Sequence, residues 1–208
     1  MSISTEAPRR GAAATDLPAG RWRTVDIVVA AVIAVAFGAV FQVWNLAWEG
    51  ARPAFLFFPP LQGAMYGVWM IPGVLVPLVI RRPGAALLGE AVAAAASALF
   101  GAQWGLATIV YGLLQGAAAE LIFAFGLYRR WGLVAAILAA ASAGAAASLL
   151  DLILYYPEWA PAWQLAYSAL VIPSSALVGG LGSWGLVRSL AETGVLSGFA
   201  SGRDQREV

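Results

Sequence analysis

VDIVVAAVIAVAFGAVFQVWNL, residues 25–46, is long and apolar enough to cross a membrane as one helix. Asp26 is its one charged residue. A bilayer core is about 30 Å thick, and an α-helix needs about 20 apolar residues to cross it. The stretch is too long for the core of a signal peptide, and no convincing cleavage site follows it. We therefore predict a transmembrane helix here.

The composition of the whole chain extends this prediction beyond one helix. Of its 208 residues, 61% are hydrophobic and 11% are charged, and the mean hydropathy is +0.79. Soluble domains are about 45–50% apolar and about 25% charged, so this chain could not cover its own surface in water. The net charge of +1 gives no indication of a nucleic-acid partner or a large acidic partner.

Six segments are long enough, or nearly so, to span a bilayer. The third is the weakest because it is rich in alanine and contains Glu90. We predict an all-α polytopic membrane bundle of about six transmembrane helices, at residues 25–46, 61–80, 84–101, 104–127, 131–156 and 163–188. The corresponding domains are a disordered cytoplasmic tail at 1–24, a transmembrane domain at 25–190 and a cytoplasmic tail at 191–208.

The arginines alternate between the predicted loops. They lie before the first helix, after the second, fourth and sixth helices, and in the C-terminal tail, whereas the other loops hold only Arg52. The positive-inside rule places arginine-rich loops in the cytoplasm. We therefore expect both termini to be cytoplasmic, with eleven of the twelve arginines on that side.

Three residue types are absent from the chain, and their absence narrows the possible functions. The chain has no cysteine, no histidine and no lysine. Thiolate and Ser-His catalysis are excluded, and metal or cofactor sites are not expected. A Walker A loop needs lysine, so another subunit must supply any ATP hydrolysis. We expect a membrane subunit rather than an enzyme.

Two carboxylates lie well inside predicted spans, at Glu90 and Glu120. A charged side chain there costs a few kcal/mol or more, so such residues face the interior and mark function, unless a protonated carboxyl simply joins two helices. Their positions on antiparallel helices predict similar depths near the cytoplasmic side. Asp26 and Asp151 lie near helix ends, where a structural role is favoured.

Polar and aromatic side chains supply the other candidates. Tyr111 and Gln115 share the small, polar face of the fourth helix with Gly112 and Gly116, a GxxxG pattern typical of close helix packing. Gln62 lies near the outer end of the second helix. Trp44, Asn45 and Trp48 end the first helix on the aromatic-rich outer side, which suits either an interfacial belt or an outward-opening pocket.

The order of these segments resembles the S component of energy-coupling factor (ECF) vitamin transporters, of the YkoE-like thiamine/hydroxymethylpyrimidine type. The matching stretches are VDIVVAAVIAVAFGAVFQVWN in the first helix, RRPGAALLGE entering the third and WGLATIVYGLLQGAAAELIFA in the fourth. With the six-helix pattern, the resemblance covers nearly all of residues 24–188. It implies a multi-pass protein of the bacterial inner membrane that captures a vitamin from outside.

The resemblance also implies partners and roles for particular residues. The partners would be a transmembrane coupling subunit, docked by the small-residue ridge of Ala30, Ala34 and Gly38, and two ATPase subunits. Thiamine fits the side chains available, because its cation suits aromatic faces and a carboxylate. We expect substrate-binding residues among Glu120, Glu90, Gln115, Trp44, Asn45, Trp48, Tyr111 and Gln62. Should the glutamates carry no ligand, Asp151 and the outer tryptophans are the next candidates.

Two other functions remain open. A secondary transporter would use Glu90 and Glu120 as proton carriers, although the chain shows no duplicated half. A membrane enzyme would have to rely on carboxylates alone, and no clustered DxxD-type pair is present. Assays of the purified protein would distinguish the three functions. A substrate-capture subunit would bind the vitamin without turnover, a secondary transporter would show ion-coupled uptake, and an enzyme would show chemical turnover.

Overall fold

The computed structural model describes residues 21–203. These residues fold as helices joined by short turns, as the all-α prediction expected. The first predicted tail lies outside the described residues except for residues 21–24. The elements are α1 (Thr24–Ala51), η1 (Arg52–Phe55), η2 (Pro59–Met70), α2 (Ile71–Ile80), α3 (Ala85–Leu99), α4 (Ala107–Phe125), α5 (Leu133–Leu154), α6 (Pro161–Ser174), η3 (Ser175–Leu181), α7 (Gly182–Glu192) and α8 (Ala200–Arg203).

Several elements join into continuous rods. Five rods are long and apolar enough to cross a membrane, and α3 is a shorter apolar helix. The five rods and α3 lie at the positions of the six predicted segments, but α3 is shorter than a spanning helix. The five long rods are Thr24–Phe55, Pro59–Ile80, Ala107–Phe125, Leu133–Leu154 and Pro161–Glu192.

Two rods change helical type along their length, and in each a proline lies near the change. Pro72 has no N–H, so the carbonyl of Val68 is bonded instead by the N–H of Ile71, which ends the 3₁₀ segment η2. The second rod passes from α6 through a π-helical segment, η3, soon after Pro173. Both irregular segments pack against each other, where Gly67 lies against the backbone of Ser174.

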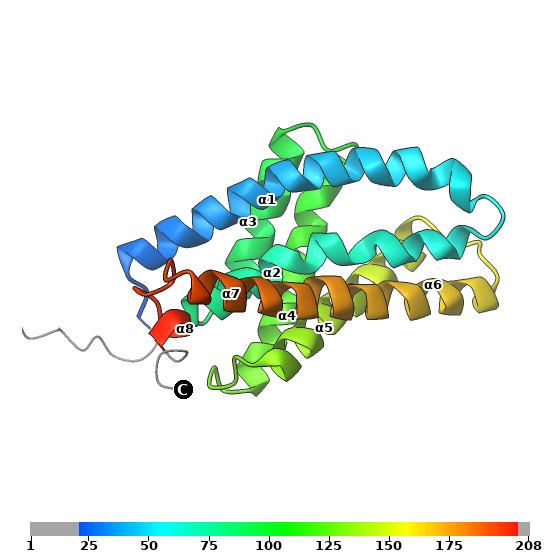
Figure 1. Ribbon diagram of the computed structural model, residues 1–208. Coiled ribbons are helices and arrows are strands. Elements are labelled where there is room, and N and C mark those ends of the chain that lie inside the picture. The colour runs from blue at the N-terminus through cyan, green and yellow to red at the C-terminus, as the bar shows by residue number, and fades with distance from the viewer. Residues whose placement is uncertain (1–20, 204–208) are drawn as a thin grey trace, which may run out of the picture.

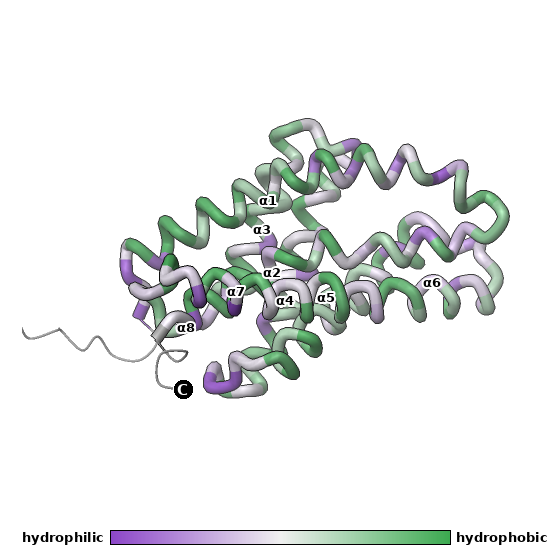
Figure 2. The backbone as a smooth tube through the Cα atoms, viewed as in Figure 1, coloured by the Kyte–Doolittle hydropathy of each residue, from purple (hydrophilic) through white to green (hydrophobic). Residues whose placement is uncertain are grey.

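The helices form two groups that cross (Figure 1). Helix α1, the η2–α2 rod and the α6–α7 rod run side by side, and α3, α4 and α5 pass behind them at an angle. The α1–η2 and α5–α6 connections lie at one end of the molecule. The start of α1 and the end of α7 lie at the other. Hydrophobic residues cover most of the rods, and hydrophilic ones gather near the ends and loops (Figure 2).

An ion-pair cluster closes the end that holds the start of α1. Asp26 is fully buried and pairs with Arg23 at 2.7 Å and with Arg82 at 3.3 Å. The C-terminal segment covers the same end, with Phe199 buried and the Ser201 hydroxyl donating to a backbone carbonyl of α2. Residues 193–203 therefore pack against the bundle, and this part of the expected C-terminal tail belongs to the fold.

Small residues allow α3 and α4 to approach closely. A Cβ atom added at Gly112 would overlap the Cβ of Ala94, and one added at Gly116 would come within 2.9 Å of the Leu87 Cα. The GxxxG pattern of α4 thus serves helix packing, and Gly116 packs against the stem of Glu90 on α3.

Candidate functional site

A cavity of about 530 Å³ lies towards the end of the molecule that holds the α1–η2 and α5–α6 connections. This volume falls in the range of about 300–1,000 Å³ typical of small-molecule pockets. Its walls come from α1, η1, η2, α3, α4, α5, α6 and the α3–α4 and α5–α6 connections. The lining residues that carry polar or aromatic groups are Phe41, Asn45, Trp48, Glu49, Arg52, Phe55, Gln62, Tyr66, Trp69, Glu90, Ser97, Trp104, Thr108, Tyr111, Gln115, Asp151, Tyr155, Tyr156, Trp159 and Tyr167.

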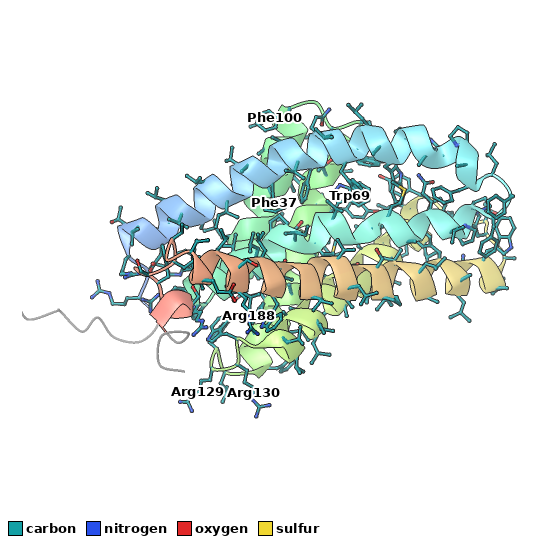
Figure 3. All side chains as sticks on the ribbon, in the orientation of Figure 1. Phe37, Trp69, Phe100, Arg129, Arg130 and Arg188 are labelled. Atoms are coloured by element: carbon teal, nitrogen blue, oxygen red, sulfur yellow. The ribbon has the colours of Figure 1, made fainter. Side chains whose placement is uncertain are left out.

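The first aromatic wall stands between α1 and η2. The rings of Trp48 and Trp69 lie 4.9 Å apart, and Tyr66 meets Trp69 edge to face at 5.1 Å. Trp104 adds a further edge-to-face contact with Trp69 at 5.7 Å. Figure 3 shows Trp69 in the space between α1 and the η2–α2 rod. These contacts hold the rings in fixed orientations around the cavity.

A second aromatic wall comes from the α5–α6 connection and the helices beside it. Tyr156 and Trp159 stack with their rings 4.0 Å apart, and Trp159 meets Tyr167 edge to face at 5.8 Å. Burial, with the nearby Asp151 charge, raises the pKa of Tyr156 to about 12. Tyr156 therefore stays a neutral phenol at physiological pH, and the wall contributes aromatic faces without a charge of its own.

A carboxylate lies between these aromatic residues. The hydroxyl of Tyr111 on α4 donates to Oδ1 of Asp151 at 2.6 Å, and the hydroxyl of Tyr167 on α6 donates to Oδ2 at 2.7 Å. Asp151 itself is on α5 and is 5% exposed. Each oxygen thus has a donor, which holds the carboxylate in place at the wall of the cavity.

A second carboxylate, Glu90, reaches the cavity from α3. It is buried, and its Oε2 accepts a hydrogen bond from the Gly73 N–H at 2.7 Å. The absence of a side chain at Gly73 makes this approach possible, because an added Cβ would lie 2.9 Å from the same oxygen. Gln115 on α4 is buried and lines the cavity as well.

Polar side chains of α1 and η2 complete the lining. The amide of Asn45 donates to the Ser97 hydroxyl at 3.3 Å, and its oxygen accepts from the Trp69 indole at 3.1 Å. Gln62 donates to the Trp48 carbonyl at 2.8 Å. These bonds tie α1 to α3 and to η2 around the cavity.

Six of the eight residues expected to bind substrate therefore lie together on one cavity. They come from four elements, and the structure brings together Asn45, Trp48, Gln62, Glu90, Tyr111 and Gln115. The other two, Glu120 and Trp44, do not line it.

Glu120 is placed elsewhere by its hydrogen bonds. Its carboxylate accepts from the backbone N–H groups of Gly84 at 2.6 Å and Ala86 at 2.8 Å, at the start of α3. Burial, together with the nearby Glu120 carboxylate, raises the pKa of the Tyr128 phenol. The unpaired N–H groups of a helix start attract a carboxylate. Glu120 thus caps α3, which corrects the expectation that it faces the substrate.

Trp44 does not line the cavity, and the small-residue ridge does not lie on an exposed docking surface. The Trp44 indole donates to the Met65 carbonyl at 3.0 Å and so joins α1 to η2. Ala30, Ala34 and Gly38 are buried within the chain, and a Cβ at Gly38 would lie 2.5 Å from that of Ala96 on α3. In this conformation the ridge packs α1 against its own bundle, so it is not open to a partner subunit.

Sequence reasoning gave too little weight to several lining residues. Asp151 lies near the end of its helix, where a structural role is favoured. Tyr66 lies on a stripe of the second helix that is typical of packing, and Tyr167 is not among the expected binding residues. Ser97 and Thr108 were also missed as lining residues. The aromatic richness of the outer side was the available indication of the walls, but helical spacing alone does not show which rings meet.

Comparisons with known proteins place this arrangement in a family. A family described as "ABC-type cobalt transport system, permease component" matches residues 25–146. A protein of Bacillus subtilis (strain 168) named as the HMP/thiamine permease protein YkoE is 33% identical over 187 residues, covering 89% of this chain and 93% of that protein. A crystal structure of an S-component of an ECF transporter superposes with a TM-score of 0.86 at 31% identity, covering 90% and 94% of the two chains.

The chain belongs to the ECF transporter S-component family. The resemblance inferred from the order of segments is thereby confirmed. An S component is a multi-pass membrane transport subunit and not an enzyme, which agrees with the composition and with the spans described above. In such a subunit, the aromatic cavity is the candidate substrate site.

Proposed function

We propose that this chain captures thiamine or its hydroxymethylpyrimidine precursor from outside a bacterial cell. The single observation that carries this proposal is Asp151, a carboxylate held by two phenols within aromatic walls. Aromatic faces and a desolvated carboxylate both attract an organic cation such as the thiazolium ring of thiamine. The YkoE relative, named for this vitamin and its precursor, supports the same choice.

The remaining polar lining suits the aminopyrimidine ring that thiamine and its precursor share. Glu90, Gln115 and Asn45 offer carboxylate and amide groups from three helices around the cavity. An amino group and ring nitrogens need both acceptors and donors, which these side chains supply. A ring placed here would be read by hydrogen bonds, while the thiazolium would be recognised by charge.

The proposed partners are a transmembrane coupling subunit and two ATPase subunits. The chain contains no lysine and therefore no Walker A loop, so any ATP hydrolysis that drives uptake must come from another subunit. The cavity lies near the connections expected to face outside, whereas Arg129, Arg130 and Arg188 lie towards the other end (Figure 3). This arrangement supports capture from outside with both termini in the cytoplasm.

A cobalt ion is the second candidate, because the matching family description names cobalt. First-row transition metals bind strongly to imidazole and thiolate ligands, and this chain has neither histidine nor cysteine. Within residues 21–203, no three Asp or Glu side chains gather closely enough to hold a metal ion. The lining therefore favours an aromatic organic cation over a metal.

Isothermal titration of the purified protein with thiamine, hydroxymethylpyrimidine and Co²⁺ tests the proposal. We expect both organic ligands to bind and Co²⁺ not to bind. Asp151→Asn should weaken thiamine binding by about 1.5–3 kcal/mol, roughly ten- to a hundredfold in affinity, because it removes a charge-assisted contact. It should affect the uncharged precursor much less.

Glu158→Gln provides the matched control, because Glu158 is exposed and does not line the cavity. It should bind both ligands as the parent does. Equal losses of thiamine and of its precursor in Asp151→Asn would make Asp151 a structural residue. Concentrative uptake by this chain alone in liposomes would instead favour an ion-coupled transporter.

A further inference from the structure

The charges around the cavity indicate which chemical form of the vitamin it accepts. Among the described lining residues, Glu49, Glu90 and Asp151 are acidic and Arg52 is basic. Arg52 donates to Oε2 of Glu49 at 3.1 Å, and Gln103 donates to Oε1 of the same carboxylate at 3.3 Å. The guanidinium at the rim is thus already paired with a carboxylate beside it. The two deeper titratable groups, Glu90 and Asp151, are both carboxyl groups, so the described lining has no basic side chain below the rim.

Backbone N–H groups are the other usual binding site for phosphate, especially at the start of a helix. At three of the elements that begin near the cavity, several N–H groups of the first turn are already used or missing. At α4, the N–H groups of residues 107–109 donate to carbonyls of the preceding turn at 3.1–3.2 Å. Rod η2 begins with two prolines, and Trp163 and Gln164 at the start of α6 both donate to the Ala160 carbonyl.

We propose that the cavity accepts the alcohol form of the vitamin and rejects its phosphate esters. This inference rests on the proposed function and defines its substrate class further. A phosphate ester adds about 1.5–2 negative charges at neutral pH. Inside this cavity it would meet acceptor carboxylates, and at the rim it would have to displace Glu49 from Arg52. Neither position offers the unpaired cationic donors that phosphate requires.

Competition binding of thiamine, thiamine monophosphate and thiamine diphosphate to the full chain tests this inference. We expect the Kd of the monophosphate to exceed that of thiamine by at least about tenfold, and the diphosphate to bind more weakly still. Glu49→Gln should reduce the ratio of the monophosphate Kd to the thiamine Kd by at least about threefold, because it releases Arg52 to bind the phosphate. Glu158→Gln is the control and should leave the ratio unchanged.

A monophosphate that binds within about tenfold of thiamine would overturn the inference while leaving the proposed function intact. An unchanged ratio in Glu49→Gln would overturn the role assigned to the rim pair. Failure of thiamine itself to bind would overturn the proposed function and this inference together.

Discussion

Glu120 illustrates how a carboxylate inside a membrane protein can serve the fold alone. Its oxygens accept hydrogen bonds from three backbone N–H groups at the start of α3, including that of Leu87 at 3.3 Å. Glu120→Ala would leave these donors unpaired, at a cost of about 1–3 kcal/mol of folding stability. We expect a lower melting temperature in detergent with little change in thiamine affinity.

The matched control is Glu192→Ala, which removes an exposed ion pair with Arg188 and should leave the melting temperature nearly unchanged. A large loss of thiamine affinity in a folded Glu120→Ala protein would contradict the capping role. The carboxylate would then have to reach the ligand directly.

Glu90 depends on the glycine opposite it. A methyl group at Gly73 would lie 2.9 Å from Oε2 of Glu90 and would push the carboxylate away from its backbone donor. We expect Gly73→Ala to weaken binding of hydroxymethylpyrimidine about tenfold, as measured by titration calorimetry. Gly185→Ala is the control, because no atom lies within 4 Å of its added Cβ. Equal affinities in the two variants would place Glu90 outside the binding site.

At the scale of single residues, the sequence predicted part of the site and missed part of it. Helical phase correctly brought Tyr111 and Gln115 to one interior face, and both line the cavity. It could not show that Glu120, at the border of that face, meets the start of α3. Nor could it show that Asp151 lies between Tyr111 and Tyr167, because those contacts join three different helices.

At the scale of elements, α3 and α4 both line the cavity, and their close contact sets the spacing between them. Gly112 allows the two helices to meet at Ala94, and Glu90 projects from α3 beside this contact. Gly112→Leu should therefore destabilise the fold by at least about 1–3 kcal/mol and lower the yield of monodisperse protein. Size-exclusion chromatography and thermal unfolding in detergent would measure both effects.

Ala117→Leu, on the exposed face of the same helix, is the control for Gly112→Leu. It adds the same side chain where lipid can accommodate it, so we expect parent-like stability. If Gly112→Leu were as stable as this control, the close packing of α3 and α4 would not hold in the membrane.

The helices themselves were the part of the structure that the sequence predicted best. Long apolar segments bounded by arginine, glycine and proline gave helix positions close to those observed, because length and hydropathy are the main requirements for crossing a bilayer. The 3₁₀ and π segments were not predicted. They arise where Pro72, Gly67 and Ser174 adjust the packing of two rods, which depends on contacts distant in sequence.

At the scale of the whole molecule, orientation can be tested cleanly because the chain has no cysteine of its own. Ala160→Cys lies in the α5–α6 connection at the cavity end, and Arg129→Cys lies in the α4–α5 loop; both positions are exposed. We expect an impermeant thiol reagent to label Ala160→Cys in intact cells. Arg129→Cys should react only after permeabilisation, since arginine-rich loops face the cytoplasm. The reverse pattern would invert the proposed topology.

The proposed function depends most of all on the identity of the molecule that the aromatic cavity holds. Native mass spectrometry of the protein purified from cells grown with thiamine measures that identity directly. We predict that the parent protein retains a species with the mass of thiamine or of hydroxymethylpyrimidine. Asp151→Asn should retain much less thiamine than the parent. A retained cobalt ion, or equal retention of thiamine by the parent and by Asp151→Asn, would contradict the account.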